Sequence, residues 1–276
     1  IRMIQATITG DQQNDFRNNG FLTLDKFINL ELLDELKKRI DLLFKGEFET
    51  GIEPDEWNWR SDRDPSDVTR QICNAWKSDN LIKEVVCSPV IGQIVSELMG
   101  WRGARLIQDN ILWKPPQGKP LAYHQDAAYI DWIVPQSMAT CWIPLDNILQ
   151  ENGALEFAVE SHLWELCPPS DSFHAPEDYK EELNRYLKNN NKKLETYAVD
   201  VPAGGVSFHH GMTWHGSGVN LTSQDRRAIV AHCVPNDAQF HDSNCGGTGK
   251  IYRKFKLNDS NKLDDSFFPL LWENND

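Results

Sequence analysis

A change of pattern at Gly100 constrains the fold of this chain more than any other feature. Before Gly100, apolar residues recur at helical spacing over residues 29–44 and 79–99, and Pro89 divides the second stretch in two. From Gly100 to Val234, short runs typical of strands alternate with turns that contain Gly or Pro. This order, in a chain of 276 residues, predicts a mainly β fold flanked by N-terminal α-helices, arranged as a double-sheet jelly roll.

The chain shows no internal repeat, low-complexity tract or convincing domain linker, so we expect a single domain over residues 1–276. Within it, residues 1–100 would form a mostly helical support and lid, and residues 101–240 would form the jelly-roll core. Residues 241–276 would follow as a C-terminal extension.

Two polar stretches, residues 46–76 and 168–194, are expected to cover a pocket, because long loops in compact domains often act as lids. The first stretch contains Trp57, Trp59 and Trp76, whose apolar rings favour a packed lid over a disordered segment. The second stretch contains a helix-like run but is otherwise polar, so we expect an insertion between strands.

The composition disfavours several classes of partner. The net charge of −13 argues against nucleic acids and anionic membranes, because both are bound through basic surfaces. No apolar run reaches the length of a membrane span, and the six cysteines form no CxxC pair. We expect a cytoplasmic monomer or homodimer that acts on a small molecule. The start at Ile1 rather than Met leaves a preceding targeting segment open.

Three residues form a candidate metal site. His124 and Asp126 lie two apart in a strand-like stretch, where alternate side chains share a face, so the two could bind one ion. His215 is followed by Gly and Ser, which allow a close backbone approach. Two histidines and one carboxylate are the ligands of non-haem Fe(II) oxygenases, although such short motifs also occur by chance. His209 alternates with Ser207 on a strand and is expected to support the site or the core.

Arg226 and Arg227 open an apolar strand, and only one of them can point inward. A buried arginine needs an anionic partner, and its planar guanidinium suits a carboxylate. An inward Arg226 would therefore meet either an acidic side chain or a dicarboxylate ligand. The alternative is a pair of surface arginines.

The middle of the chain resembles the phytanoyl-CoA dioxygenase family of Fe(II)/2-oxoglutarate oxygenases. The resemblance runs from about Gln108 to Val234 and depends on the order and spacing of several blocks. These blocks are His124-Gln125-Asp126, Trp142, Glu151-Asn152-Gly153-Ala154-Leu155, Ser161-His162, His215-Gly216-Ser217 through Thr222, and Arg226-Arg227-Ala228. Relatives usually carry Pro-Gly before the Ser-His pair, whereas this chain carries Val159-Glu160, so the resemblance does not imply the substrate.

The resemblance implies a cupin-like double-stranded β-helix that binds Fe(II) and uses 2-oxoglutarate and O2 as co-substrates. His124, Asp126 and His215 would be the iron ligands. Arg226 would bind the distal carboxylate of 2-oxoglutarate together with Ser217. Three further residues are implied to line the co-substrate pocket: Trp142, Gln125 and Gln108, with Lys114 a further possibility.

We therefore expect an enzyme that oxidises an unactivated C–H bond of a small organic molecule, with release of succinate and CO2. Hydroxylation is the default outcome, and desaturation, cyclisation and epoxidation stay open. Two alternatives use the same three residues. One is a cupin-like metal hydrolase or isomerase that needs no 2-oxo acid. The other is a non-catalytic protein that binds the metal or 2-oxoglutarate.

Overall fold

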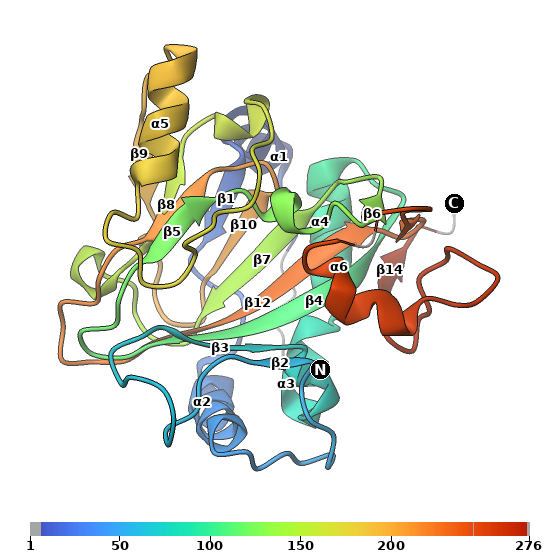
Figure 1. Ribbon diagram of the computed structural model, residues 1–276, viewed down its shortest axis with the longest axis horizontal. Coiled ribbons are helices and arrows are strands. Elements are labelled where there is room, and N and C mark those ends of the chain that lie inside the picture. The colour runs from blue at the N-terminus through green and yellow to red at the C-terminus, as the bar shows by residue number, and fades with distance from the viewer. Residues whose placement is uncertain (1–6, 245, 275–276) are drawn as a thin grey trace.

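Two facing antiparallel β-sheets form the body of the protein, and helices cover the outer face of the larger sheet. The computed structural model describes residues 7–244 and 246–274 (Figure 1). Within these residues, no helix has the length and apolar character needed to cross a lipid bilayer. The predicted jelly roll is confirmed, since the two sheets enclose the space in which the candidate metal residues meet.

The larger sheet has eight strands and includes strands from both ends of the chain. In spatial order it contains β1 (Phe21–Leu24), β10 (Val206–His210), β7 (Ala139–Pro144), β12 (Arg226–Pro235), β4 (Gly103–Lys114), β3 (Arg70–Cys73) and β2 (Glu56–Trp57), and β14 (Leu270–Glu273) pairs with β4. The sheet therefore draws strands from all three parts of the predicted division at residues 100 and 240.

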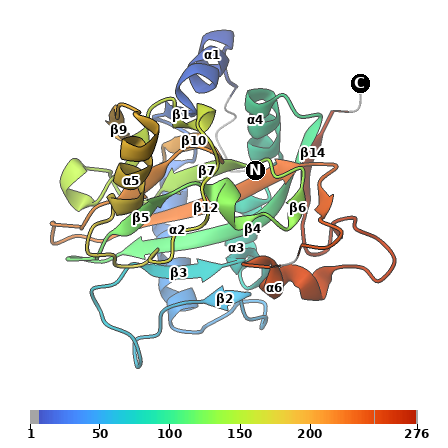
Figure 2. The ribbon, with the colours of Figure 1, turned by 45° about the horizontal axis from the view of Figure 1, so that its top comes forward.

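The smaller sheet faces the inner side of the larger one. Its order is β5 (Leu121–His124), β11 (His215–Ser217), β8 (Leu155–Ala158) and β9 (Thr196–Ala198). A two-stranded ribbon joins β6 (Ile133–Val134) to β13 (Gln239–Phe240). Figure 2 shows β5 and β9 on the opposite side of the larger sheet from α2.

The helices begin and end where local signals place them. They are α1 (Gly10–Asn19), α2 (Leu30–Phe44), α3 (Asn80–Val86), α4 (Pro89–Met99), α5 (Glu181–Asn190) and α6 (Gly249–Tyr252), with 3-10 turns η1 (Ala75–Lys77), η2 (Asp126–Tyr129), η3 (Gln150–Asn152), η4 (Ser161–Leu163) and η5 (Arg253–Phe255). The Asn29 side chain caps α2, and Gly100 ends α4 in the left-handed region at φ 69°. The two long N-terminal helical stretches are thus confirmed, with the break at Pro89.

Alternation along each strand separates a core from a site. On β12, Ile229, Ala231 and Cys233 point toward the apolar core beneath α2, α3 and α4. The intervening residues, among them Arg226 and His232, point into the space between the sheets. The larger sheet is therefore a platform with an apolar helix-facing side and a functional inner side.

Two predictions about local structure are wrong. The strand that carries His124 ends there, and Asp126 begins the 3-10 turn η2 instead of continuing the strand. The tryptophans at 57, 59 and 76 pack with the helix-facing core and do not cover the pocket. Asn58 and Phe173, one from each polar stretch, do line the cavity, and the role of these stretches as a lid stays a prediction.

Candidate metal centre

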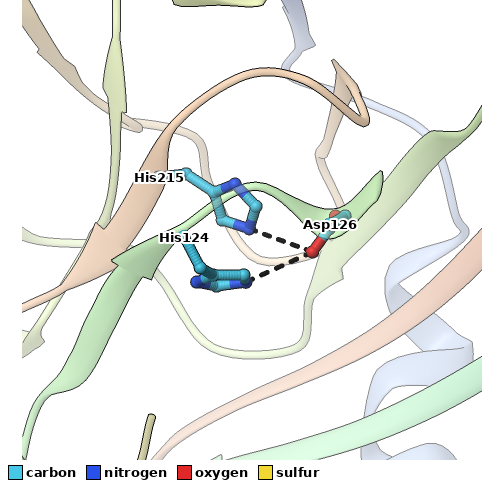
Figure 3. Close-up of side chains that lie close together, drawn as sticks. All are labelled: His124, Asp126 and His215. Carbon is cyan, nitrogen blue, oxygen red and sulfur yellow. Dashed lines mark ion pairs between the residues drawn. The ribbon is translucent and has the colours of Figure 1, made fainter. Parts of the chain in front are cut away.

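His124, Asp126 and His215 meet at one point between the sheets (Figure 3). His124 ends β5, His215 begins β11, and the two residues are paired in register. The Oδ1 atom of Asp126 lies 3.2 Å from Nε2 of His124 and 3.4 Å from Nε2 of His215. One candidate ligand atom from each residue lies within 4.8 Å of the others. Two imidazole nitrogens and one carboxylate oxygen fit a divalent transition-metal ion.

Backbone carbonyls hold both imidazoles in the orientation that metal binding requires. The Nδ1 atom of His124 lies 2.8 Å from the carbonyl oxygen of Ala122, and Nδ1 of His215 lies 2.9 Å from that of Thr213. A carbonyl oxygen only accepts hydrogen bonds, so each Nδ1 carries the proton in the neutral ring. Each Nε2 therefore keeps its lone pair and points it at the same position.

A hydrogen-bond network fixes the other oxygen of Asp126. The hydroxyl of Thr140 donates to Oδ2 at 2.6 Å, and Nε2 of His209 lies 3.0 Å from the same oxygen. Burial alone would raise the pKa of Asp126, but the nearby His215 and His232 and the hydrogen bond from His209 hold it well below its usual value. His209 thus has the supporting position expected for it.

The network continues away from the metal residues. Nδ1 of His232 lies 2.9 Å from the Thr140 hydroxyl, and its Nε2 lies 2.8 Å from the side-chain nitrogen of Asn110. His232 and Thr140 were not singled out as site residues from the sequence. Their positions could have been found by alternation, because His232 shares a strand face with Arg226 and Thr140 shares one with Trp142.

Arg226 points inward and Arg227 points outward, so the alternative of two surface arginines is wrong. Arg226 is 2% exposed and lines the same cavity as the metal residues. Among the described residues, its Nε has no hydrogen-bond partner, and burial lowers its pKa to about 10. The nearest acid that affects it, Asp146, instead binds Arg227 at 3.1 Å. A guanidinium in this position needs an anionic ligand.

Ser217 lines the cavity together with Arg226 and is held by the buried Lys114, whose pKa is held well below its usual value by burial and by Arg226. The Nζ atom of Lys114 donates to the Ser217 hydroxyl oxygen at 2.7 Å and to the carbonyl of Gly218. Lys114 is directly opposite Arg226 in the β12–β4 register. Because the serine oxygen accepts from Lys114, its own proton remains available to donate to an anion. Lys114 was only a secondary possibility from the sequence.

The cavity has a volume of about 290 Å³ and brings most of the predicted site residues together. Its lining includes His124, Asp126, His215, Arg226, Ser217, Trp142 and Gln108. Trp142 lies below the guanidinium of Arg226, 5.7 Å from ring centroid to carbon. Such a cavity is of the size that holds one small ligand or two fragments.

Gln125 faces away from this cavity. Its Nε2 donates to the carbonyl of Met212 at 2.8 Å, and its Oε1 accepts from the backbone of Cys167 at 2.8 Å. These bonds tie the turn after β5 to the loops before β11 and after η4. The geometry therefore supports a positioning role for Gln125, and its predicted contact with the co-substrate gains no support.

Comparison with known proteins agrees with this chemistry. The family model described as phytanoyl-CoA dioxygenase (PhyH) matches residues 16–228. A probable alpha-ketoglutarate-dependent hypophosphite dioxygenase from Stutzerimonas stutzeri is 24% identical over 235 residues, which cover 83% of this chain and 79% of the relative. A 2-aminoethylphosphonate dioxygenase from an uncultured bacterium is 26% identical over 225 residues, covering 80% of this chain and 79% of the relative.

The fold is shared with solved structures as well. The crystal structure of the non-heme alpha ketoglutarate dependent carbocyclase SnoK from nogalamycin biosynthesis aligns with a TM-score of 0.73 and 20% identity. The alignment covers 96% of this chain and 97% of that protein. Because the family model spans most of the sequence and the fold agrees over nearly all of it, the chain belongs to the phytanoyl-CoA dioxygenase family of Fe(II)- and 2-oxoglutarate-dependent oxygenases.

Proposed function

We propose that His124, Asp126 and His215 bind the Fe(II) of this enzyme and that Arg226 and Ser217 bind the distal carboxylate of 2-oxoglutarate. The reaction oxidises an unactivated C–H bond of a small organic molecule, with hydroxylation as the expected outcome and succinate and CO2 as by-products. The observation that carries the proposal is the shared cavity. Three convergent ligand atoms line the same space as a buried guanidinium whose Nε has no hydrogen-bond partner among the described residues.

The donor set fits Fe(II). Two neutral imidazoles and one carboxylate leave coordination positions for a bidentate 2-oxo acid and for O2. Bound Fe(II) supplies the activation of O2, coupled to oxidative decarboxylation of 2-oxoglutarate. The chain keeps Asp126 pre-arranged for this role, because Thr140 and His209 occupy its Oδ2 and leave Oδ1 facing the two imidazoles.

Arg226 and Ser217 fit a dicarboxylate. Arg226 offers a planar pair of donors, and Ser217 offers a hydroxyl proton that Lys114 leaves free. The Trp142 ring lines the cavity with its centroid 5.7 Å from the guanidinium carbon of Arg226. Gln108 lines the cavity but bonds to Tyr252 and Glu56, so its predicted contact with 2-oxoglutarate stays a prediction.

A small substrate is favoured by the size of the cavity and by the chain's charge. A volume of about 290 Å³ must hold 2-oxoglutarate and at least the reacting part of the substrate. Hypophosphite and 2-aminoethylphosphonate, named for two relatives, are small polar molecules. The net charge of −13 makes a strongly anionic substrate such as an acyl-CoA less favourable.

The test is succinate formation from 2-oxoglutarate with added Fe(II). Asp126→Ala should lose at least about 100-fold of this activity, since a metal ligand is removed. The matched control, Asp62→Ala, removes an exposed carboxylate far along the chain and should keep full turnover. Full turnover in Asp126→Ala would contradict the ligand assignment. Fe(II)-independent activity, or activity that needs no 2-oxo acid, would favour a metal hydrolase or isomerase.

A further inference from the structure

One wall of the cavity is polar and is not used by the metal or by the groups proposed for 2-oxoglutarate. It is formed by inward-facing side chains of β2, β3 and β4, completed by α6 from the C-terminal region. Its members are Glu56, Asn58, Gln71, Cys73, Gln108, Asn110 and Tyr252. Strand pairing places them in one row, since Glu56 pairs with Cys73 and Cys73 pairs with Asn110.

Glu56 is the centre of this wall. Its Oε1 accepts a hydrogen bond from the Tyr252 hydroxyl at 3.0 Å and one from the Gln108 amide at 3.3 Å. Cys73 is a further neighbour of the carboxylate. All three neighbours are neutral, so they orient the carboxylate without balancing its charge. Burial accordingly raises the pKa of Glu56, although the bond from Tyr252 opposes that rise.

Two lysines, Lys77 and Lys254, are already paired with Asp55, the carboxylate next to Glu56 in the chain. Nζ of Lys77 lies 2.5 Å from Asp55 Oδ2, and Nζ of Lys254 lies 3.3 Å from Asp55 Oδ1. Among the cavity-lining residues that the structure describes, Arg226 is the only lysine or arginine. Glu56 therefore faces the cavity as a carboxylate without a positive partner from the described chain.

The pairing of charges indicates what the remaining space prefers. In the proposed assignment Asp126 binds the metal and Arg226 binds the distal carboxylate of 2-oxoglutarate. Lys114 bonds to Ser217 and to the carbonyl of Gly218, so it does not pair with Glu56 either. A positive group of the substrate is therefore the partner that this cavity leaves for Glu56.

Aromatic rings in the lining of the cavity also favour a cation. Tyr129, Trp132 and Phe173 line the same cavity, and Trp132 stacks on Tyr252 with ring centroids 5.3 Å apart. Aromatic faces attract ammonium groups electrostatically. A polar wall with one carboxylate and aromatic rings in the same cavity therefore offers complementary contacts to a positively charged nitrogen and its carbon skeleton.

We propose that Glu56, held by Gln108 and Tyr252, binds an ammonium group of the substrate, so that the enzyme oxidises a small amine. This inference rests on the proposed function and assigns the substrate class of the same site. The subsite is connected to the metal residues through Gln108, Asn110, His232 and Thr140, which form successive hydrogen bonds ending at Asp126. Its position relative to the reacting centre is therefore fixed by the larger sheet.

The test compares the binding of ligands that share a carbon skeleton and differ in charge. Enzyme loaded anaerobically with Fe(II) and 2-oxoglutarate is titrated calorimetrically with primary, secondary and quaternary amines. Each amine has a neutral partner and an acidic partner on the same skeleton, for example cyclohexylamine, cyclohexanol and cyclohexanecarboxylate. We expect binding by amines, at least about tenfold tighter than by their neutral and acidic partners. The proposal is overturned if no amine binds, or if neutral or acidic partners bind as tightly.

The variant Glu56→Gln keeps the shape of the side chain and removes its charge. We expect it to weaken binding of the tightest amine at least about tenfold. The control Glu53→Gln neutralises an exposed carboxylate of the same loop and should bind that amine as the parent does. Equal affinity in Glu56→Gln and the parent would overturn the assignment.

Binding of 2-oxoglutarate in the same variants separates this inference from the proposed function. Glu56→Gln should bind 2-oxoglutarate with unchanged affinity, which also shows that the variant is folded. Loss of amine binding together with 2-oxoglutarate binding would mean that Glu56 is structural and would overturn the subsite. Failure of the parent enzyme to bind 2-oxoglutarate would refute the proposed function, whatever the amines do.

Discussion

Replacing Arg226 by methionine should separate ligand binding from stability. The guanidinium is 2% exposed, lines the cavity and lacks a hydrogen-bond partner for Nε within residues 7–244 and 246–274. Met has a similar volume and no charge. We expect Arg226→Met to be as stable as the parent or more stable when 2-oxoglutarate is absent, because a costly buried charge is removed.

The magnitude follows from the burial of the guanidinium. Burial lowers the pKa of Arg226 from 12.5 to about 10. A tenfold change in a proton equilibrium corresponds to about 1.4 kcal/mol, so keeping this group charged costs roughly 3 kcal/mol. The pKa of about 10 is a net value that already includes the attraction to Asp146, so no further deduction for that contact applies.

Thermal unfolding with and without 2-oxoglutarate measures both effects. At 2-oxoglutarate concentrations about 100 times the Kd, the parent should gain roughly 2.7 kcal/mol, or about 5–10 °C in Tm. Arg226→Met should lose this gain. The matched control Arg227→Met should behave in the opposite way. It loses the bonds to Asp146 at 3.1 and 3.2 Å and should be destabilised, but it should keep the 2-oxoglutarate shift.

Two results would refute this reasoning. One is an Arg226→Met protein that still gains several degrees from 2-oxoglutarate, which would place the distal carboxylate elsewhere. The other is an Arg226→Met protein destabilised by several kcal/mol, which would show that the guanidinium supports the fold through the protein and not through a ligand.

Three further outcomes follow from the same contacts. Thr140→Val removes the 2.6 Å bond to Asp126 and should weaken Fe(II) affinity about tenfold or more in an anaerobic titration; unchanged affinity would contradict the network. Lys114→Met frees the Ser217 hydroxyl to rotate, so the affinity for 2-oxoglutarate should fall about tenfold while the affinity for Fe(II) stays unchanged. A variant that binds 2-oxoglutarate as tightly as the parent would show that Lys114 does not orient Ser217. Burial lowers the pKa of His210 from 6.5 to about 4. The unfolded chain therefore binds the proton first, and the free energy of unfolding should fall by up to roughly 3 kcal/mol as the pH drops from about 6.5 to 4. In His210→Gln the free energy of unfolding in urea should depend less on pH over this range, and an unchanged slope would assign the loss to other groups.

Local signals predicted most of the secondary structure. The cap at Asn29, the proline at the start of α4 and the left-handed Gly100 each act within one turn of helix, so a short window of sequence contains the whole cause. The alternation of β12 likewise predicted that only one of Arg226 and Arg227 faces inward. The sequence of β12 did not predict which groups lie near that guanidinium, because the positions of Asp146 and Lys114 depend on other parts of the fold.

The prediction that His124, Asp126 and His215 come together is confirmed, but the reason that joins two of them was wrong. A His-x-Asp spacing on a strand would align the side chains, yet the strand ends at His124 and the 3-10 turn delivers Asp126. Contacts with Thr140 and His209, on β7 and β10, set the carboxylate orientation. Such contacts join distant parts of the chain and are not encoded in a local spacing.

Glu56 shows the same limit for the substrate. From the sequence it lies in a polar loop, and its charge suggests a solvated side chain. Pairing of β2 with β3, and the return of α6 near the C-terminus, bring Glu56 against Gln108 and Tyr252. The tryptophans of that loop anchor it from the other side by packing in the helix-facing core. Glu56 becomes part of the cavity wall only when the strands of the larger sheet have paired.

Anomalous X-ray scattering from crystals grown anaerobically with Fe(II) and 2-oxoglutarate tests the site most directly. We predict one iron position bound by Nε2 of His124, Nε2 of His215 and Oδ1 of Asp126, with the distal carboxylate of 2-oxoglutarate against Arg226 and Ser217. An iron bound by other side chains, or a 2-oxoglutarate whose distal carboxylate avoids Arg226, would contradict the proposed assignment.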